Sequence, residues 1–117
     1  MAEGARENWE EQLRRGALDL AILLTVAPGE RYGLEIIRRL EELTDLVVTE
    51  GTVYPILARL TRQGILASEW VAGESAHPRK YYRLTRAGQG RLDEMLAHWR
   101  DFTGKLQQLI SAAGRAS

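Results

Sequence analysis

The chain has 117 residues and a mass of 13.2 kDa, which is the length of one compact domain. Hydrophobic residues form 44% of the sequence and charged residues 27%, proportions that exclude a fibrous or disordered chain. Cysteine is absent, which excludes disulfides and thiolate metal sites. The longest nearly apolar stretch, residues 18–27, has about half of the ~20 residues that a membrane span needs. Because residues 1–15 also lack the apolar centre of a signal peptide, we expect a cytoplasmic protein.

The net charge is zero, but the charges are unevenly distributed along the chain. Residues 1–48 carry six arginines against ten acidic residues, a net charge of −4. Residues 49–91 carry seven basic residues against three acidic ones, a net charge of +4, and the remaining residues balance. This basic excess is suited to contacts with phosphate groups.

Two helices are predicted in the first 43 residues. Apolar residues at helical spacing predict the first helix over Asn8–Val26, and proline and glycine break it within residues 28–31. A second helix is predicted over Tyr32–Leu43. Its inward residues would be Leu34, Ile37 and Leu40. The β-branched segment Leu46–Val48 is a candidate for a short bridge strand.

The third helix ends at Gly64 and begins either at Thr49 or at Gly51–Thr52, where threonine hydroxyls can cap backbone N–H groups. Pro55 does not decide between these two starts. Proline destabilises a helix little when it lies in the first turn, but after a start at Thr49 it would remove one helical hydrogen bond. The predicted inward face comprises Val53, Ile56, Leu57 and Leu60, and the outward face Thr52, Tyr54, Arg59, Arg62 and Gln63.

A hairpin and a long helix complete the chain. We predict strands over Ile65–Val71 and Arg79–Leu84, joined by the loop 72–78. Thr85 is expected to cap a final helix from Arg86 to Ser111, and residues 1–6 and 112–117 are expected to be frayed.

The predicted fold class is mainly α with a small β-hairpin (α+β), a winged helix-turn-helix with an added long C-terminal dimerisation helix. We expect residues 1–117 to form a single domain. The winged helix-turn-helix would occupy residues 8–85, with its wing at about 65–84, and the dimerisation helix residues 86–111.

In this fold the third helix enters the major groove of double-stranded DNA with its N-terminal residues near the base edges. The predicted DNA-binding residues are Thr52, Tyr54, Arg59 and Arg62 of the helix, and Arg79 and Lys80 of the wing. The alternatives are that Tyr54 is a half-buried packing residue and that Arg79 and Lys80 are a solvated surface pair. His77 is more typical of a polar loop residue.

The final helix carries an apolar stripe with the alternating spacing of three and four that is typical of a coiled coil. Its members are Leu92, Met95, Trp99, Phe102, Leu106 and Leu109. We predict that this stripe, with Trp9 and Leu13 of the first helix, forms a homodimer. The alternative is that the stripe packs on the chain's own first helix.

An enzyme is not expected. The sequence has two histidines, His77 and His98, and no glycine-rich phosphate loop, so no spacing assembles a nucleophile with a base or a metal cluster. We therefore predict no catalytic residue, no metal and no cofactor.

Two motifs together carry a family resemblance: Gly-Thr-Val-Tyr-Pro at residues 51–55 and Arg-Lys-Tyr-Tyr-Arg-Leu-Thr at residues 79–85. With the segments 18–24 and 32–36, they make the chain resemble small members of the PadR family of bacterial transcriptional regulators, over about residues 13–109. The resemblance implies a dimeric repressor whose C-terminal helices exchange across the dimer. By position, Thr52, Tyr54, Arg79 and Lys80 match the family's DNA-contacting residues.

Some members of this family bind small aromatic or cationic effectors between the C-terminal helices, which makes Trp9 and Trp99 candidates for an effector pocket. The resulting prediction is a cytoplasmic bacterial repressor, bound to the nucleoid when active, that recognises a pseudo-palindromic operator with half-sites about one helical turn apart. The alternative is a winged-helix protein-interaction module that has no affinity for duplex DNA.

Overall fold

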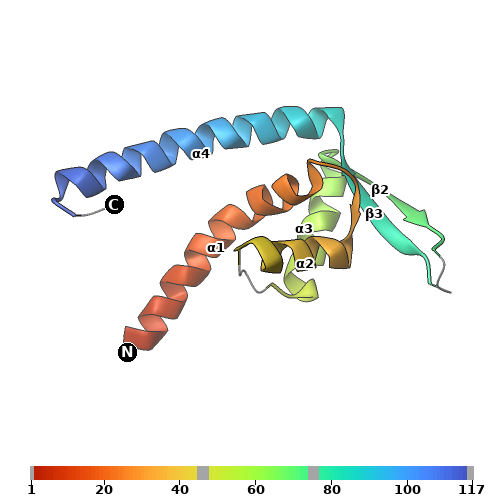
Figure 1. Cartoon of the computed structure of the whole chain (residues 1–117), viewed down its shortest axis with the longest axis horizontal. Helices are drawn as coiled ribbons and strands as arrows, with labels where there is room; N and C mark the ends of the chain where they lie inside the picture. The colour runs from red at the N-terminus through yellow and green to blue at the C-terminus, as the bar shows by residue number, and fades with distance from the viewer. Residues whose placement is uncertain (1, 45–47, 74–76, 116–117) are drawn as a thin grey trace.

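The computed structural model describes residues 2–44, 48–73 and 77–115 of the chain. In chain order its elements are α1 (Ala2–Val26), β1 (Arg31–Tyr32), α2 (Gly33–Thr44), α3 (Glu50–Arg62), β2 (Leu66–Val71), β3 (Arg79–Leu84) and α4 (Arg86–Ala112). The molecule measures 57 × 35 × 23 Å. It is elongated because the N-terminal half of α1 and the C-terminal half of α4 project to one side, away from α2, α3 and the strands (Figure 1).

Both long helices exceed their predicted lengths. Helix α1 begins at Ala2 rather than Asn8, so the prediction of a frayed start is wrong for residues 2–6. Helix α4 continues to Ala112, and Gly114, with φ of 74°, follows its C-terminal cap. Residues 116 and 117 lie outside the described residues. None of the described helices combines the length and the hydropathy that a membrane crossing requires.

The core lies where α1, α2 and α3 meet the sheet. Its fully buried side chains are Ile22, Leu23, Val26, Ile36, Val53, Leu57 and Leu66. Ile36 was not predicted to face inward, whereas the predicted Leu34 is only partly buried. The reason is that α2 packs between α1 and α3, which buries a wider stripe than one helical face.

The predicted hairpin is part of a three-stranded antiparallel sheet in the order β1-β3-β2. Strand β1 pairs Arg31 with Tyr82 and Tyr32 with Tyr81 of β3. Tyr32 therefore belongs to a strand, and the prediction that it opens the second helix is wrong by one residue. A two-residue strand depends on pairing with a distant segment, so it leaves little local pattern. Residues 46 and 47 of the candidate bridge strand lie outside the described residues, and Val48 is buried without regular structure.

Helix α3 begins at Glu50, which agrees with the earlier of the two predicted starts, and Thr49 is its N-cap residue. The Thr49 carbonyl accepts from the N–H of Val53, but its hydroxyl caps no backbone group and instead contacts the Thr52 hydroxyl at 3.1 Å. Pro55 consequently lies inside the helix. It lacks the N–H that would bond to the Gly51 carbonyl.

The end of α3 and the start of α4 meet at one junction. Gly64 has φ of 76°, and the N–H of Ile65 donates to the Leu60 carbonyl, which closes the helix. The Thr85 hydroxyl lies 2.6 Å from the Gly64 carbonyl oxygen and 3.0 Å from that of Ile65, and it accepts from the N–H of Gly88. The Ile65 carbonyl oxygen occupies the position that a Cβ at Gly88 would need.

We predict that Gly88→Ala lowers the free energy of unfolding by about 2 kcal/mol, because its methyl group would force the backbone at Ile65 away from α4. The measurement is urea denaturation followed by circular dichroism. Gly90→Ala in the same helix is the control, since no atom lies within 4 Å of its added Cβ. Alanine there should stabilise by up to ~1 kcal/mol through helix propensity. Equal stability changes in the two variants would contradict the close packing at Gly88.

Candidate nucleic-acid interface

Helix α3 presents its two predicted base-contacting residues on different sides. Tyr54 is 39% exposed and faces the start of α2 and the wing, where it lines a pocket. Thr52 lines a second, larger groove between α1, α3 and α4. The two side chains lie two positions apart on the helix, so its 3.6-residue turn directs them apart. The structure therefore does not bring Thr52 and Tyr54 together.

The position of Tyr54 depends on Gly33, the first residue of α2. A Cβ at Gly33 would collide with the Tyr54 ring, so the absence of a side chain there lets the ring lie against the α2 backbone. Partial burial, and to a smaller extent the nearby Glu50 carboxylate, raises the pKa of Tyr54. The Tyr54 phenol is thus a neutral hydroxyl at physiological pH, able to donate a hydrogen bond.

The two basic residues of the wing lie over aromatic rings. The Arg79 guanidinium is 4.5 Å from the centroid of the Tyr32 ring. The Lys80 ammonium is 5.7 Å from the Trp70 ring centroid and 5.9 Å from that of Tyr82. Trp70 and Lys80 face each other across the β2–β3 ladder, so the sheet register creates this contact.

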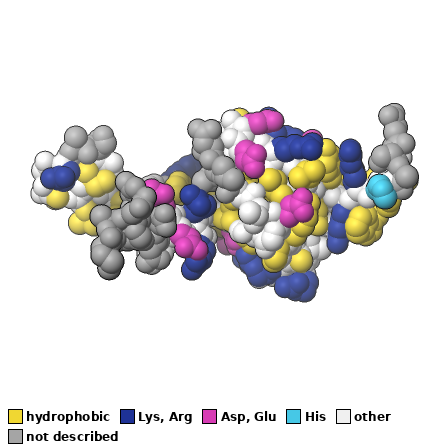
Figure 2. Space-filling view, turned by 90° about the horizontal axis from the view of Figure 1, so that it is seen from below, with side chains coloured by type: hydrophobic (Ala, Val, Ile, Leu, Met, Phe, Trp, Pro, Cys, Tyr) yellow, Lys and Arg dark blue, Asp and Glu magenta, His cyan; other side chains and the backbone are white. Residues whose placement is uncertain are grey.

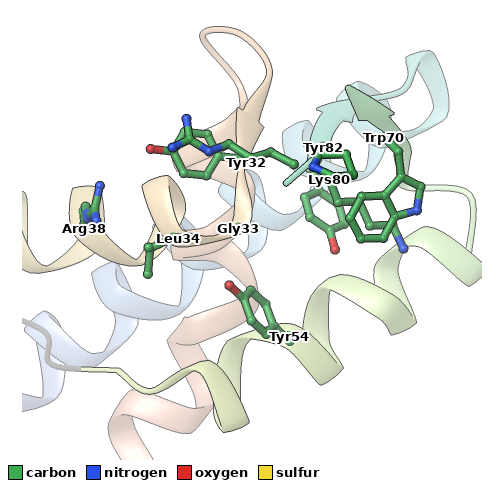
Figure 3. A pocket seen from close by; sticks show the side chains of 10 residues that line it. Tyr32, Gly33, Leu34, Arg38, Tyr54, Trp70, Lys80 and Tyr82 are labelled. Carbon is green, nitrogen blue, oxygen red and sulfur yellow. The ribbon is translucent and has the colours of Figure 1, made fainter. Parts of the chain in front are cut away.

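Together these residues surround a pocket of about 400 Å³ (Figure 3). Figure 3 shows Tyr54 rising from α3 toward Gly33, with Trp70, Lys80 and Tyr82 on the wing side. Lys and Arg side chains also lie beside hydrophobic surface at the end of the molecule that carries the hairpin (Figure 2).

The sequence pattern predicted functional roles for Tyr54, Arg79 and Lys80 but not for the aromatic residues Tyr32, Trp70 and Tyr82 that line the same pocket. Lys80 and Tyr82 lie two positions apart in the predicted strand, a spacing from which it could have been predicted that they share a face of the sheet.

The two arginines of α3 differ in their surroundings. One terminal nitrogen of Arg59, Nη2, donates to both carboxylate oxygens of Asp19 in α1, at 2.9 and 2.8 Å. Arg62 lies in the last turn of α3 and is exposed. Arg59 therefore joins α3 to α1, a role that the outward position of its side chain did not predict.

The apolar stripe of α4 divides into a buried and an exposed part. Leu92 is buried in the chain's own core, and Met95 packs against that core. The exposed members of the predicted dimer surface are Trp9, Leu13, Trp99, Phe102, Leu106 and Leu109. Neither Trp9 nor Trp99 lines the two pockets described above. His77 and His98 are both exposed. In the part of the chain that the structure describes, no three potential metal ligands cluster together.

Three helices, a wing and an added C-terminal helix define a winged helix-turn-helix protein of the DNA-binding type. The chain belongs to the PadR-like family of transcriptional regulators, whose family model matches residues 22–94.

Similar proteins include transcriptional regulator Rv3488 of Mycobacterium tuberculosis, 35% identical over 71% of this chain and 76% of that protein. A PadR family transcriptional regulator from Eggerthella lenta has a solved structure with a TM-score of 0.85, at 32% identity over 93% of this chain and 95% of the other. A PadR-like transcription factor from Bacteroides fragilis superposes with a TM-score of 0.74, at 37% identity over 87% of this chain and 98% of the other.

We predict that Asp19 and Arg59 stabilise the fold jointly by about 1 kcal/mol, because their ion pair is partly buried and doubly hydrogen-bonded. The measurement is a double-mutant cycle of unfolding free energies with Asp19→Ala and Arg59→Ala. Glu11 and Arg15 provide the matched control, an exposed pair at 3.1 Å within α1. Its coupling should be about 0.3 kcal/mol. A coupling in the Asp19 cycle no larger than this would show that the pair does not hold α3 against α1.

Proposed function

We propose that the protein is a homodimeric transcriptional repressor that binds a pseudo-palindromic DNA operator through α3 and the wing. The observation that carries the proposal is the grouping of Tyr54, Arg79 and Lys80 around one surface pocket. A phenol on the recognition helix and two cations on the wing are the groups that contact phosphates and groove edges. Arg62, exposed in the last turn of α3, is a further proposed contact to DNA. Arg59, paired with Asp19, would contribute less than its position in the sequence suggests.

We propose that the chain forms a single domain with two functional parts. Residues 8–85 would form the winged helix-turn-helix that contacts DNA, and residues 86–111 would form the helix that binds a second copy of the chain. Six large hydrophobic side chains, two on α1 and four on α4, are exposed in one chain, and exposed apolar groups in this number are typical of a protein–protein interface. We propose that a second copy of the chain covers these side chains, because a palindromic operator requires two identical recognition helices.

Two further features of the proposal rest on the family resemblance. One is repression in the cytoplasm, with the protein bound to the nucleoid. The other is its relief by a small aromatic or cationic effector near Trp9 and Trp99, which the dimer would bring together between its C-terminal helices.

We predict that the chain enriches palindromic fragments from genomic DNA at moderate salt. On the selected operator, Arg79→Gln/Lys80→Gln should weaken binding and make the salt slope shallower by roughly two units, since about two phosphate contacts are lost. The measurement is fluorescence anisotropy of labelled operator at several salt concentrations.

The matched control is Arg100→Gln/Arg115→Gln, which removes the same charge from exposed positions on or just after α4. It should leave the salt slope unchanged. An unchanged slope in the wing variant would contradict the wing contacts. Failure to enrich any palindrome would favour the protein-interaction module instead.

We predict that the wild-type protein has a mass of roughly twice 13.2 kDa by light scattering and that Phe102→Ser/Leu109→Ser converts it to a monomer. These side chains are 60% and 67% exposed in one chain and would be buried between two. Leu43→Ser on α2 is the control, because Leu43 is also 67% exposed but lies outside the proposed dimer surface. A dimer that persists in the α4 variant would place the interface elsewhere.

A further inference from the structure

The wing carries a large apolar side chain that the fold leaves uncovered. Trp70 of β2 is 67% exposed, although it lies on the face of the sheet that packs against the core. Successive residues of a strand point to opposite faces, so Trp70 shares its face with Leu66 and, across the ladder, with Leu84. Leu66 is buried in the core and Leu84 packs against it. Trp70 lies farther along this face, where it lines the pocket between the wing, α3 and the start of α2.

The sheet register places a cation beside this ring. Lys80 of β3 pairs with Trp70, and its ammonium lies 5.7 Å from the centroid of the Trp70 ring and 5.9 Å from that of the Tyr82 ring. Both rings therefore attract the same ammonium. Figure 3 shows Trp70, Lys80 and Tyr82 together on the wing side of the pocket. Arg79 and Val71 pair with each other, and their side chains point to the opposite face of the hairpin.

The pocket also contains two neutral hydroxyls. Burial raises the pKa of Tyr82, with a smaller contribution from Tyr54, and burial also raises the pKa of Tyr54, with a smaller contribution from Glu50. Both phenols are therefore protonated at neutral pH and can donate hydrogen bonds to an anion. None of the lining residues is acidic in the part of the chain that the structure describes. The pocket, of about 400 Å³, thus combines a cation and two donors with a large apolar ring.

The pocket lies between two elements that are proposed to bind DNA, and this position indicates which part of a duplex would cross it. In the proposed complex α3 lies in the major groove and the wing lies at the adjacent minor groove. A single sugar–phosphate strand separates two adjacent grooves, so this strand has to pass between α3 and the wing. Its phosphates match Lys80 and the phenols, but they do not match the Trp70 indole, which has one N–H donor and a wide apolar surface. The apolar part of the same strand is the deoxyribose that alternates with the phosphates.

We propose that Trp70 contacts DNA: its indole ring packs against one deoxyribose of the strand that crosses the pocket, while Lys80 and the Tyr54 hydroxyl contact the neighbouring phosphates. The proposal rests on the proposed function and adds to it a residue that recognises the sugar. A ribose at this nucleotide is disfavoured, because its 2′-hydroxyl would be buried against the ring without a hydrogen-bond partner. Lys80 makes no such distinction, since the phosphates of ribose and deoxyribose nucleotides are the same.

The first test measures the affinity of Trp70→Ala for the operator that the wild-type chain selects, by fluorescence anisotropy at several salt concentrations. The dissociation constant should rise about tenfold, because a large ring contact is lost. The salt slope should stay unchanged, because no charge is removed. A shallower slope would show that the ring only holds Lys80 in place, and it would overturn the proposal. Circular dichroism verifies that the variant is folded.

The matched control is Val71→Ala. Val71 is the next residue of β2 and is also an exposed apolar side chain, but it lies on the opposite face of the hairpin and does not line the pocket. Its variant should bind the operator with wild-type affinity. An equal loss of affinity in Val71→Ala and Trp70→Ala would overturn the proposal, because the loss would not depend on the face that carries the ring.

The second test identifies the sugar. Single ribonucleotides replace the deoxyribonucleotides of the operator one position at a time. The wild-type chain should bind at least about fivefold more weakly when the substitution falls on one particular nucleotide of each half-site. Trp70→Ala should show no loss at that nucleotide, whereas Val71→Ala should show the wild-type pattern. A sensitive position that persists in Trp70→Ala, or a wild-type chain that tolerates every substitution, would overturn the contact.

The outcomes separate this proposal from the proposed function. A wild-type chain that binds a palindromic operator, together with a Trp70→Ala variant of equal affinity, would overturn the sugar contact and leave the proposed function standing. A wild-type chain that binds no duplex DNA would overturn the proposed function, and the sugar contact with it.

Discussion

The close approach of α4 to the Ile65 carbonyl is the contact on which the arrangement of the recognition helix and the wing depends. Ile65 follows α3 and precedes β2, and Thr85 lies between β3 and α4. The N–H of Thr85 donates to the Ile65 carbonyl, while its hydroxyl contacts the Gly64 and Ile65 carbonyl oxygens. The network therefore ties together the ends of four elements. Only glycine fits at position 88, so the contact constrains the sequence as well as the geometry.

This arrangement creates the pocket, because its walls belong to elements that the junction orients. Tyr54 comes from the helix that ends there, and Trp70 and Lys80 come from the strands that begin and end beside it. The pocket also depends on Gly33, since any side chain there would displace the Tyr54 ring. Gly88 thus allows α4 to approach the backbone at Ile65, and Gly33 allows the Tyr54 ring to approach the backbone of α2. The exposed aromatic and basic groups can then act as one surface.

The sequence was sufficient for features that are encoded locally and insufficient for those that depend on distant partners. Helical spacing, the glycine after α3 and the threonine before α4 predicted the order of the elements. Tyr54, Arg79 and Lys80, which were predicted to contact DNA, line one pocket. Strand β1 was missed because two residues form a strand only by pairing with β3. Arg59 looked like a free surface cation because its partner, Asp19, lies 40 positions earlier in the chain.

Helix α1 connects the proposed dimer surface to the recognition helix in one continuous element of 25 residues. Leu13 is exposed on its projecting half, and Asp19, six positions later, holds Arg59 of α3. At about 1.5 Å per residue these positions are roughly 9 Å apart along the axis. A displacement of α1 at the proposed dimer surface would therefore be transmitted to α3 through the ion pair between Asp19 and Arg59 and through the adjoining core. In a dimer of the proposed kind, packing at Trp9 and Leu13 together with the exposed stripe of α4 would set the separation of the two recognition helices, and so the operator spacing that they fit.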